Sequence, residues 1–344
     1  MLQSEAGPRR PEINQARPDA TLADVSAETE PRRWRTWLPV PVATAMCLGV
    51  HWFVSDKEPA PETRSYFVFV WSVLGVALVM AAAQTQLPRL RRWMRHAGPI
   101  FAAALLMLAA WELITSGFRW LPLPYFPGPA GVFQSLINDH VLLFDSTWHS
   151  LVLLLSGYAM GVVAGFISGV CIGWSNPIRY WGMPVLKIIG PIPATAWIPL
   201  AMVVSPNALF SAAALIALAV WFPVTMLTAS GISNTRASYL DVARTLGARR
   251  AYLIFRVAIP AALPSIFIGL FMGLGASFLT LVVAETVGVK SGLGWYVSWA
   301  QGWAEYGKVY AALVIMAAFF STIMTLLFKV RDRVLVWQKG VIKW

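Results

Sequence analysis

The chain has 344 residues, of which 58% are hydrophobic and only 12% are charged. A soluble domain is normally about half apolar and about a quarter charged, so this composition excludes an ordinary soluble globular protein and predicts an integral membrane protein. The net charge of +11 falls mostly in loops beside apolar segments, where basic residues orient membrane helices. We therefore expect the chain to contact a lipid bilayer and to have no nucleic-acid partner.

Residues 1–37 are polar and rich in proline, arginine and acidic residues, so we expect a disordered cytosolic tail there. The rest of the chain holds apolar runs close to the roughly 20 residues that cross a bilayer. They lack the two-residue alternation of a membrane β-barrel, so the predicted fold class is an all-α membrane protein. The eight predicted spans lie near 38–54, 66–84, 98–116, 147–174, 183–204, 208–230, 264–288 and 309–328.

Most of the 27 lysines and arginines fall on one side of the membrane if the spans alternate from a cytosolic N-terminus. Because basic loops stay in the cytosol, we expect both termini there, with residues 338–344 as a cytosolic tail. Lys187 is an exception to the loop pattern, since it lies inside a predicted span.

The fourth span has a glycine at every fourth position, which places these residues on one face of a helix. Such a ridge lets another helix backbone approach closely. One interpretation is a seam along which helices slide during transport, and the other is static packing. The glycines are Gly157, Gly161, Gly165, Gly169 and Gly173.

The fifth span is interrupted by Pro191, Pro193 and Pro199. Proline removes a backbone donor and kinks a helix, and broken membrane helices are tolerated where they line a cavity or meet neighbouring helices. Thr195 and Trp197 lie between these prolines and are therefore candidates for the transport path. The alternative is a kink that only serves packing.

A basic segment, 238–259, separates two apolar spans on the predicted cytosolic side. Its pattern predicts two short helices that bend at Gly247, with an apolar face rimmed by arginines. The pieces are too short to cross a bilayer, so the segment is expected to be either a docking surface for another protein or an amphipathic helix on anionic lipid.

The segment "DVARTLGARRAYLIFRVAIP" resembles the EAA motif of ABC-importer permeases. Asp241 and Ala243 stand in the opening triplet, Gly247 stands at the motif glycine, and Pro260 closes the motif after the expected spacing. "LPLPYFPGPAGVFQSL" and "VVAETVGVKSGLGWYV" resemble the branch that transports nitrate, sulfonates, taurine and bicarbonate. The likeness covers roughly residues 98–337, and leaves 38–97 as two additional transmembrane helices.

The resemblance implies a type I ABC-importer permease core of six helices, located in the plasma (inner) membrane of a bacterium. It also implies two ATPase subunits carrying ATP and Mg²⁺, a second permease copy that completes a homodimer, and an extracytoplasmic substrate-binding protein. The chain itself is then expected to bind no cofactor and to be a transport subunit without its own enzymatic activity. The implied ATPase-coupling residues are Asp241, Ala243, Arg244, Gly247, Ala248 and Pro260.

Glu285 lies near a membrane span, where a carboxylate suggests a functional site. Its two functional interpretations are a gate and a contact with the binding protein, and the alternative is an acid paired with Lys290 or with backbone groups. "GWAEYGKV" resembles a phosphate loop but has no Ser or Thr after Lys308 to hold magnesium. We therefore expect no nucleotide site, and no metal-ligand spacing is evident.

Two other functions stay open at the level of sequence. An ATP-independent secondary transporter would need intramembrane charge relays and repeated halves, and a membrane-anchored scaffold or lipid-modifying enzyme would need a catalytic cluster at the interface. Neither pattern is evident, so the expected function is a permease subunit of an ATP-driven importer for a small anion or organic acid.

Overall fold

The computed structural model describes residues 39–55, 64–84, 86–121 and 123–337. All regular structure within these ranges is helical. The expected tails 1–37 and 338–344 lie outside the described residues. The chain divides into two compact units, which are treated separately below: residues 1–53 with 67–110, and residues 54–66 with 111–344.

The helices follow the expected spans closely. Six helices are long and apolar enough to cross a membrane, a bent pair adds one further candidate span, and one shorter apolar helix covers Pro39–Val54. The first unit contains most of each of three helices: α2 (Pro39–Ser55), α3 (Arg64–Ala83) and α4 (Pro88–Glu112). The prediction of an all-α membrane protein is confirmed in the described residues.

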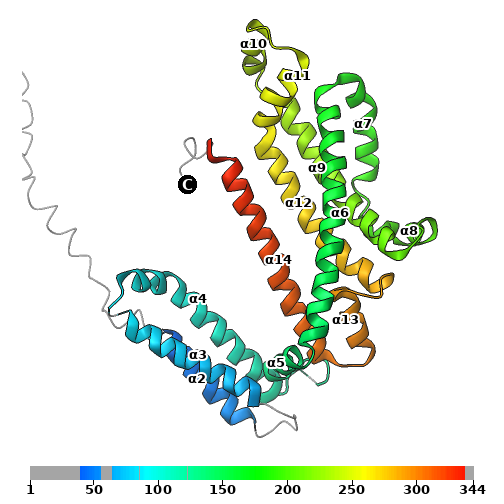
Figure 1. Ribbon diagram of the computed structural model, residues 1–344. Coiled ribbons are helices and arrows are strands. Elements are labelled where there is room, and N and C mark those ends of the chain that lie inside the picture. The colour runs from blue at the N-terminus through cyan, green and yellow to red at the C-terminus, as the bar shows by residue number, and fades with distance from the viewer. Residues whose placement is uncertain (1–38, 56–63, 85, 122, 338–344) are drawn as a thin grey trace, which may run out of the picture. The chain divides into compact units, whose positions relative to one another are not determined.

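Three long helices form the centre of the second unit: α6 (His140–Trp174), α9 (Ala208–Ser233) and α12 (Ile259–Val287). They lie side by side in Figure 1. The α6 glycines face α9, and a Cβ atom added to any of them would lie less than 3 Å from an α9 atom. The two backbones therefore meet with almost no side chain between them.

The order of these contacts gives the helix directions. Gly157 meets Ile216 and Gly173 meets Ile232, so α6 and α9 run parallel. Gly273 of α12 meets Val220. Gly269, four residues earlier, meets Val224, so α12 runs antiparallel to α9. These directions fit spans that alternate across the membrane, provided that one further crossing lies between α6 and α9.

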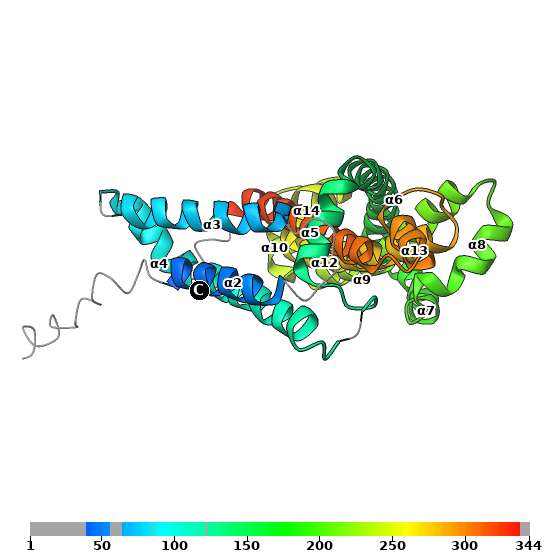
Figure 2. The ribbon, with the colours of Figure 1, turned by 90° about the horizontal axis from the view of Figure 1, so that it is seen from below.

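That intermediate crossing is a broken helix. It consists of α7 (Asn176–Ile189), the 3₁₀ turn η4 (Ala194–Trp197) and α8 (Ile198–Val204), and the two arms meet at 84°. The prolines thus produce a sharp bend where the sequence predicted one kinked span. Figure 2 shows α7 and α8 at the edge of the unit, with α8 projecting outward.

The short helices cap the two ends of this unit (Figure 1). At one end α9 leads into α10 (Ala237–Thr245), α11 (Arg250–Tyr252) and the π-helical turn η5 (Leu253–Ala258). At the other end lie α5 (Pro129–Asn138) and α13 (Leu293–Gly302). The last helix, α14 (Tyr306–Val334), starts beside α5 and α13 and diverges from α6 along its length.

Candidate coupling surface and transport path

The basic segment folds as an elbow made of α10, α11 and η5, joined at Gly247. The backbone N–H of Gly247 donates to the carbonyl of Arg244 at 2.9 Å, and the N–H of Ala248 donates to that of Ala243 at 3.0 Å. These two bonds cap the C-terminus of α10, and this type of cap requires a residue in the left-handed conformation just after the helix. Gly247 supplies it with φ of +80°, so the motif glycine sets the bend of the elbow.

The elbow presents an apolar cleft of about 800 Å³. Leu246 is 82% exposed and Phe255 is 64% exposed, although both are large apolar side chains. Arg249 and Arg256 also line this cleft. A surface with large exposed apolar residues edged by charge is typical of a protein-interaction site, and the same pattern is compatible with lipid contact.

The sequence-predicted coupling residues gather in this elbow. Ala243, Gly247 and Ala248 line the cleft. Asp241 and Arg244 are exposed and form an ion pair of 3.0 Å along α10. Pro260 lies in the first turn of α12, where its missing N–H costs no helical hydrogen bond.

A second feature is the cavity beside the broken span. It has a volume of about 260 Å³ and lies against the residues from Ile189 to Thr195. Thr195 of η4 and Thr280 of α12 both line this cavity, so a hydroxyl from the helix break and a hydroxyl from α12 share it. The sequence-predicted Thr195 therefore lies at a cavity between the helix break, α9 and α12.

Trp197 lies differently. It does not line this cavity, and its buried indole nitrogen has no hydrogen-bond partner among the described residues. The sequence pattern made both residues candidates for the path, and of the two only Thr195 lies at the wall of this cavity.

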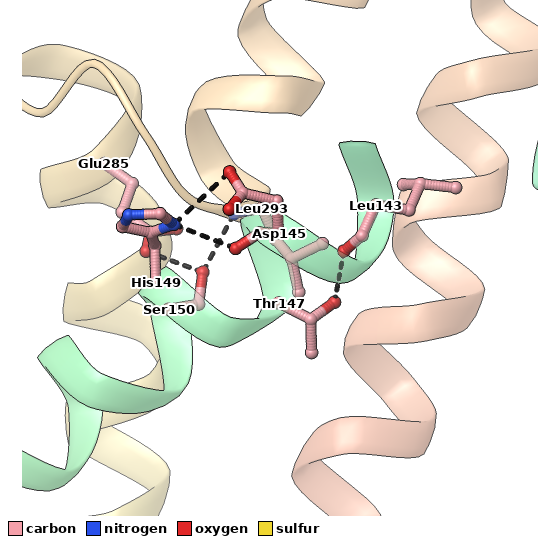
Figure 3. Close-up of polar contacts among 7 residues, drawn as sticks. All are labelled: Leu143, Asp145, Thr147, His149, Ser150, Glu285 and Leu293. Atoms are coloured by element: carbon pink, nitrogen blue, oxygen red, sulfur yellow. Dashed lines mark hydrogen bonds and ion pairs between the residues drawn. The ribbon is translucent and has the colours of Figure 1, made fainter. Parts of the chain in front are cut away.

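Glu285 lies in a buried polar site near the end of α12 that is farther from the elbow. It is 1% exposed. Ser150 Oγ of α6 donates to its Oε1 at 2.7 Å, and the backbone N–H of Gly294 donates to Oε2 at 2.8 Å. Figure 3 shows Ser150 between Glu285 and Leu293, whose N–H donates to the same serine at 2.8 Å.

Of the two kinds of partner considered for Glu285, the structure shows the backbone, and it adds Ser150, which was not considered. The described residues show no ion pair between Glu285 and Lys290. Ser150 was not identified from sequence, because no local pattern links a serine on α6 to an acid 135 residues later. The nearby His149 contacts Asp145 one turn away on α6 (Figure 3).

A further polar cluster joins α5, α13 and α14. Lys308 Nζ lies 3.2 Å from Asp139 Oδ2 and 2.7 Å from Glu305 Oε2. The hydroxyl of Tyr296 donates to Asp139 at 2.7 Å. Burial and the neighbouring Asp139 carboxylate raise the pKa of Tyr296, so this hydroxyl keeps the proton that it donates. In the segment that resembles a phosphate loop, Lys308 therefore forms ion pairs with neighbouring carboxylates of the chain.

Comparison with known proteins gives the family. Residues 161–335 match the model of the "Binding-protein-dependent transport system inner membrane component" family. The chain belongs to this family. It is therefore a multi-span permease component of an ABC importer, and the resemblance seen in the sequence is confirmed.

Several permeases are similar over most of their length. A Bacillus subtilis aliphatic sulfonates transport permease is 31% identical over 228 residues, covering 65% of this chain and 80% of the relative. The Escherichia coli taurine transport system permease is 29% identical over 190 residues, covering 55% and 67%. The Synechococcus elongatus nitrate import permease is 26% identical over 271 residues, covering 75% and 93%.

A solved structure has the same fold. It is an inward-facing form of the MetNI methionine ABC transporter, with a TM-score of 0.50 and 18% identity, covering 57% of this chain and 98% of that one. The permease therefore has the type I ABC-importer architecture with additional N-terminal helices. Because the chain belongs to this family, we set aside the two alternatives, a secondary transporter and a scaffold or lipid-modifying enzyme.

Proposed function

We propose that this permease moves a small anion through a path between two copies of the chain, driven by ATPases that dock on the α10–α11 elbow. The exposed elbow carries this proposal, because the residues resembling the EAA motif form an apolar cleft with a glycine-capped bend. An ATPase groove that receives this surface can transmit its closure to α9 and α12, which continue directly from the elbow.

The proposed assembly contains two permease copies, two ATPase subunits and one extracytoplasmic binding protein. ATP and Mg²⁺ belong to the ATPases. Within the described residues, no group of three or more His, Cys, Asp or Glu has the arrangement of a metal site. In this assembly the permease contributes the path and the mechanical coupling, and the ATPases contribute the hydrolysis.

The orientation is part of the proposal. The elbow and the Glu285 site lie at opposite ends of α12 (Figure 1), so they face opposite sides of the membrane. The excess of basic residues near the elbow supports a cytosolic location for that end and for both termini. Glu285 and α13 then face outward, where the binding protein delivers substrate.

The substrate class rests on the relatives. Those named above transport aliphatic sulfonates, taurine and nitrate by their names, which supports a small anion or organic acid as cargo. The cavity at the helix break is of suitable size for such a molecule, and its Thr195 and Thr280 hydroxyls can donate to an anion.

Glu285 is proposed as part of the outer gate. Its hydrogen bonds hold the start of α13 against α6 and α12. A gate needs such a fixed frame if its closure is to be reproducible. The binding protein can reach the same outer surface, so the second interpretation of Glu285, a contact with the binding protein, also fits the geometry.

The coupling role can be tested with matched glycine substitutions. Gly247→Ala adds a methyl group in open space but at φ of +80°, whereas Gly275→Ala adds one in open space inside α12 at an ordinary helical φ. Gly247→Ala should distort the elbow and weaken both co-purification with the ATPase and ATP-driven uptake. Gly275→Ala should retain both.

A surface substitution separates docking from backbone distortion. Leu246→Glu places a charge on a side chain that is 82% exposed, so the fold should survive while ATPase binding falls. Unchanged ATPase binding and uptake in both Gly247→Ala and Leu246→Glu would rule out the elbow as the coupling surface.

A further inference from the structure

Lys187 is an unusual residue for its position. It lies about three turns along α7, roughly 16 Å from the first residue of that helix. Gly190, almost one turn later, packs against Phe222 near the middle of α9. Lys187 is therefore close to the middle of the membrane, taking a hydrocarbon thickness of about 30 Å.

The other charged side chains of this unit lie elsewhere. In the described spans of the second unit, with α7 and α8 counted as one, they are all within about two turns of a span end. Arg179 is near the start of α7, while Glu285 and Lys308 are near the outer ends of α12 and α14. Lys187 is thus the single charge at this depth in the described part of the unit.

The Lys187 side chain is exposed. It lies on a face of α7 that also carries the exposed Tyr180 and Pro184 and continues to Pro191. The described residues give Lys187 neither an ion pair nor a hydrogen bond. A charged group at membrane depth is unfavourable against lipid and normally faces a water-filled cavity or the bundle interior.

The helix break leaves space that water can occupy close to Lys187. The arms of the broken span separate just after Lys187, and the 260 Å³ cavity with Thr195 and Thr280 begins at Ile189. Irregular backbone at membrane depth is tolerated where it lines a cavity. Lys187, the break and Thr195 therefore occupy neighbouring levels of the broken span, and Thr280 of α12 lines the same cavity as Thr195.

We propose that Lys187 is a binding residue for the negatively charged group of the substrate as it crosses the middle of the membrane. This inference rests on the proposed function and deepens it, since it gives the anionic cargo a cationic partner in the path. A compact ammonium suits a sulfonate, nitrate or carboxylate group. A single unpaired charge also holds an anion weakly enough for release, as conduction requires.

A labelling experiment on the assembled complex tests the position of Lys187 without knowledge of the substrate. Pro184 lies one turn before Lys187 on the same face, so Pro184→Cys is the reporter, in a background with Cys47→Ser and Cys171→Ser. The probes are two methanethiosulfonates, one bearing a sulfonate and one a trimethylammonium, applied to inside-out vesicles. Lys187 should favour the anionic reagent by raising its local concentration.

The expected result is that Lys187→Gln lowers the ratio of anionic to cationic labelling rates about three- to tenfold, for charges roughly 6 Å apart in water. Lys187→Arg should preserve the ratio. Arg179→Gln is the matched control, since it removes one charge from the same helix near its cytosolic start, and it should also preserve the ratio. Failure of both aqueous reagents to label the reporter, or a ratio unchanged by Lys187→Gln, would overturn the inference.

Uptake assays separate this inference from the proposed function. The complex with its binding protein is tested with taurine, nitrate and ethanesulfonate as probes. ATP-driven uptake of any of them by the wild type supports the proposed function, and a several-fold lower uptake rate in Lys187→Gln supports the inference. Wild-type uptake with unchanged kinetics in Lys187→Gln overturns the inference alone, whereas wild-type failure with all three counts against the proposed anion class.

Discussion

Ser150 Oγ lies 2.7 Å from Glu285 Oε1, and this contact joins α6 to α12 across 135 residues of sequence. The same hydroxyl accepts the backbone N–H of Leu293 at 2.8 Å, so one serine connects three helices. Because Glu285 is 1% exposed, its carboxyl group depends on these protein donors for its hydrogen bonds. The end of the permease that carries α13 is therefore held by a few polar contacts between long apolar helices.

Replacement of Ser150 by alanine should destabilise this end. The substitution removes a donor to Glu285 and leaves the buried N–H of Leu293 unpaired, which costs about 1–3 kcal/mol. Thermal unfolding of the purified complex in detergent measures the loss. Ser156→Ala is the control, since Ser156 bonds within its own helix, to the carbonyl of Leu153 at 3.0 Å. Equal unfolding temperatures for the two variants would contradict the structural role of Ser150.

A second prediction concerns Gly292, which precedes α13. It has φ of +99°, and an added Cβ atom would overlap the Glu285 carboxyl group. Gly292→Ala should therefore combine backbone strain with a clash against a buried carboxyl group, and reduce the yield of folded permease. Gly302→Ala should be tolerated, because Gly302 lies at the other end of the same helix and has open space around it. Size-exclusion profiles of the two variants provide the comparison.

The sequence allowed the membrane spans and one feature of their packing to be predicted. Span lengths follow from long apolar runs, and the four-residue glycine spacing is a local pattern that marks one face of α6. The bend between α7 and α8 was predicted only as a kink. Proline shows where a helical hydrogen bond is lost, but the 84° angle depends on what α9 and α12 leave free for the two arms.

The polar contacts at the α13 end could not be predicted in the same way. Ser150 and Asp139 are common residues in ordinary local sequence, and their partners lie on other helices. Their roles arise only after the helices pack. Lys308 is a different case. Its glycine-containing surroundings resemble a phosphate loop, the missing Ser or Thr already argued against one, and only the structure shows that its partners are Asp139 and Glu305.

The glycine ridge yields a third prediction. A Cβ atom at Gly169 would lie 2.6 Å from Thr228 Cβ and 2.8 Å from the carbonyl oxygen of Thr225. Gly169→Ala should push α6 away from α9 and cost about 1–3 kcal/mol, as overpacking of a close contact does. Gly75→Ala is the control in another span, since Gly75 has no neighbour within 4 Å. It should be neutral or stabilising, because alanine favours a helix over glycine. A Gly169→Ala variant as stable as Gly75→Ala would show that the ridge tolerates separation, as a sliding seam would.

The cluster at the start of α14 gives the last prediction. The helix diverges from α6 beyond its first turns (Figure 1), and at its start the ion pair of Lys308 with Asp139 ties it to the end of α5. Lys308→Met keeps much of the side-chain length but removes both ion pairs, and should cost about 1.5–3 kcal/mol, the value of hydrogen bonds to charged groups. Lys290→Met is the matched control, because Lys290 is exposed and forms no ion pair in the described residues.

A double mutant identifies the source of that loss. If Lys308 stabilises the junction mainly through Asp139, then Asp139→Asn should recover part of the stability lost in Lys308→Met, since it removes the carboxylate that lost its counter-ion. Tyr296 would still donate to the side-chain amide oxygen that this substitution leaves in place. Thermal unfolding of the two single variants and the double variant measures the coupling between the two positions. Strict additivity would place the effect of Lys308 in its other contacts, with Glu305 and with the ring of Trp299 at 5.0 Å.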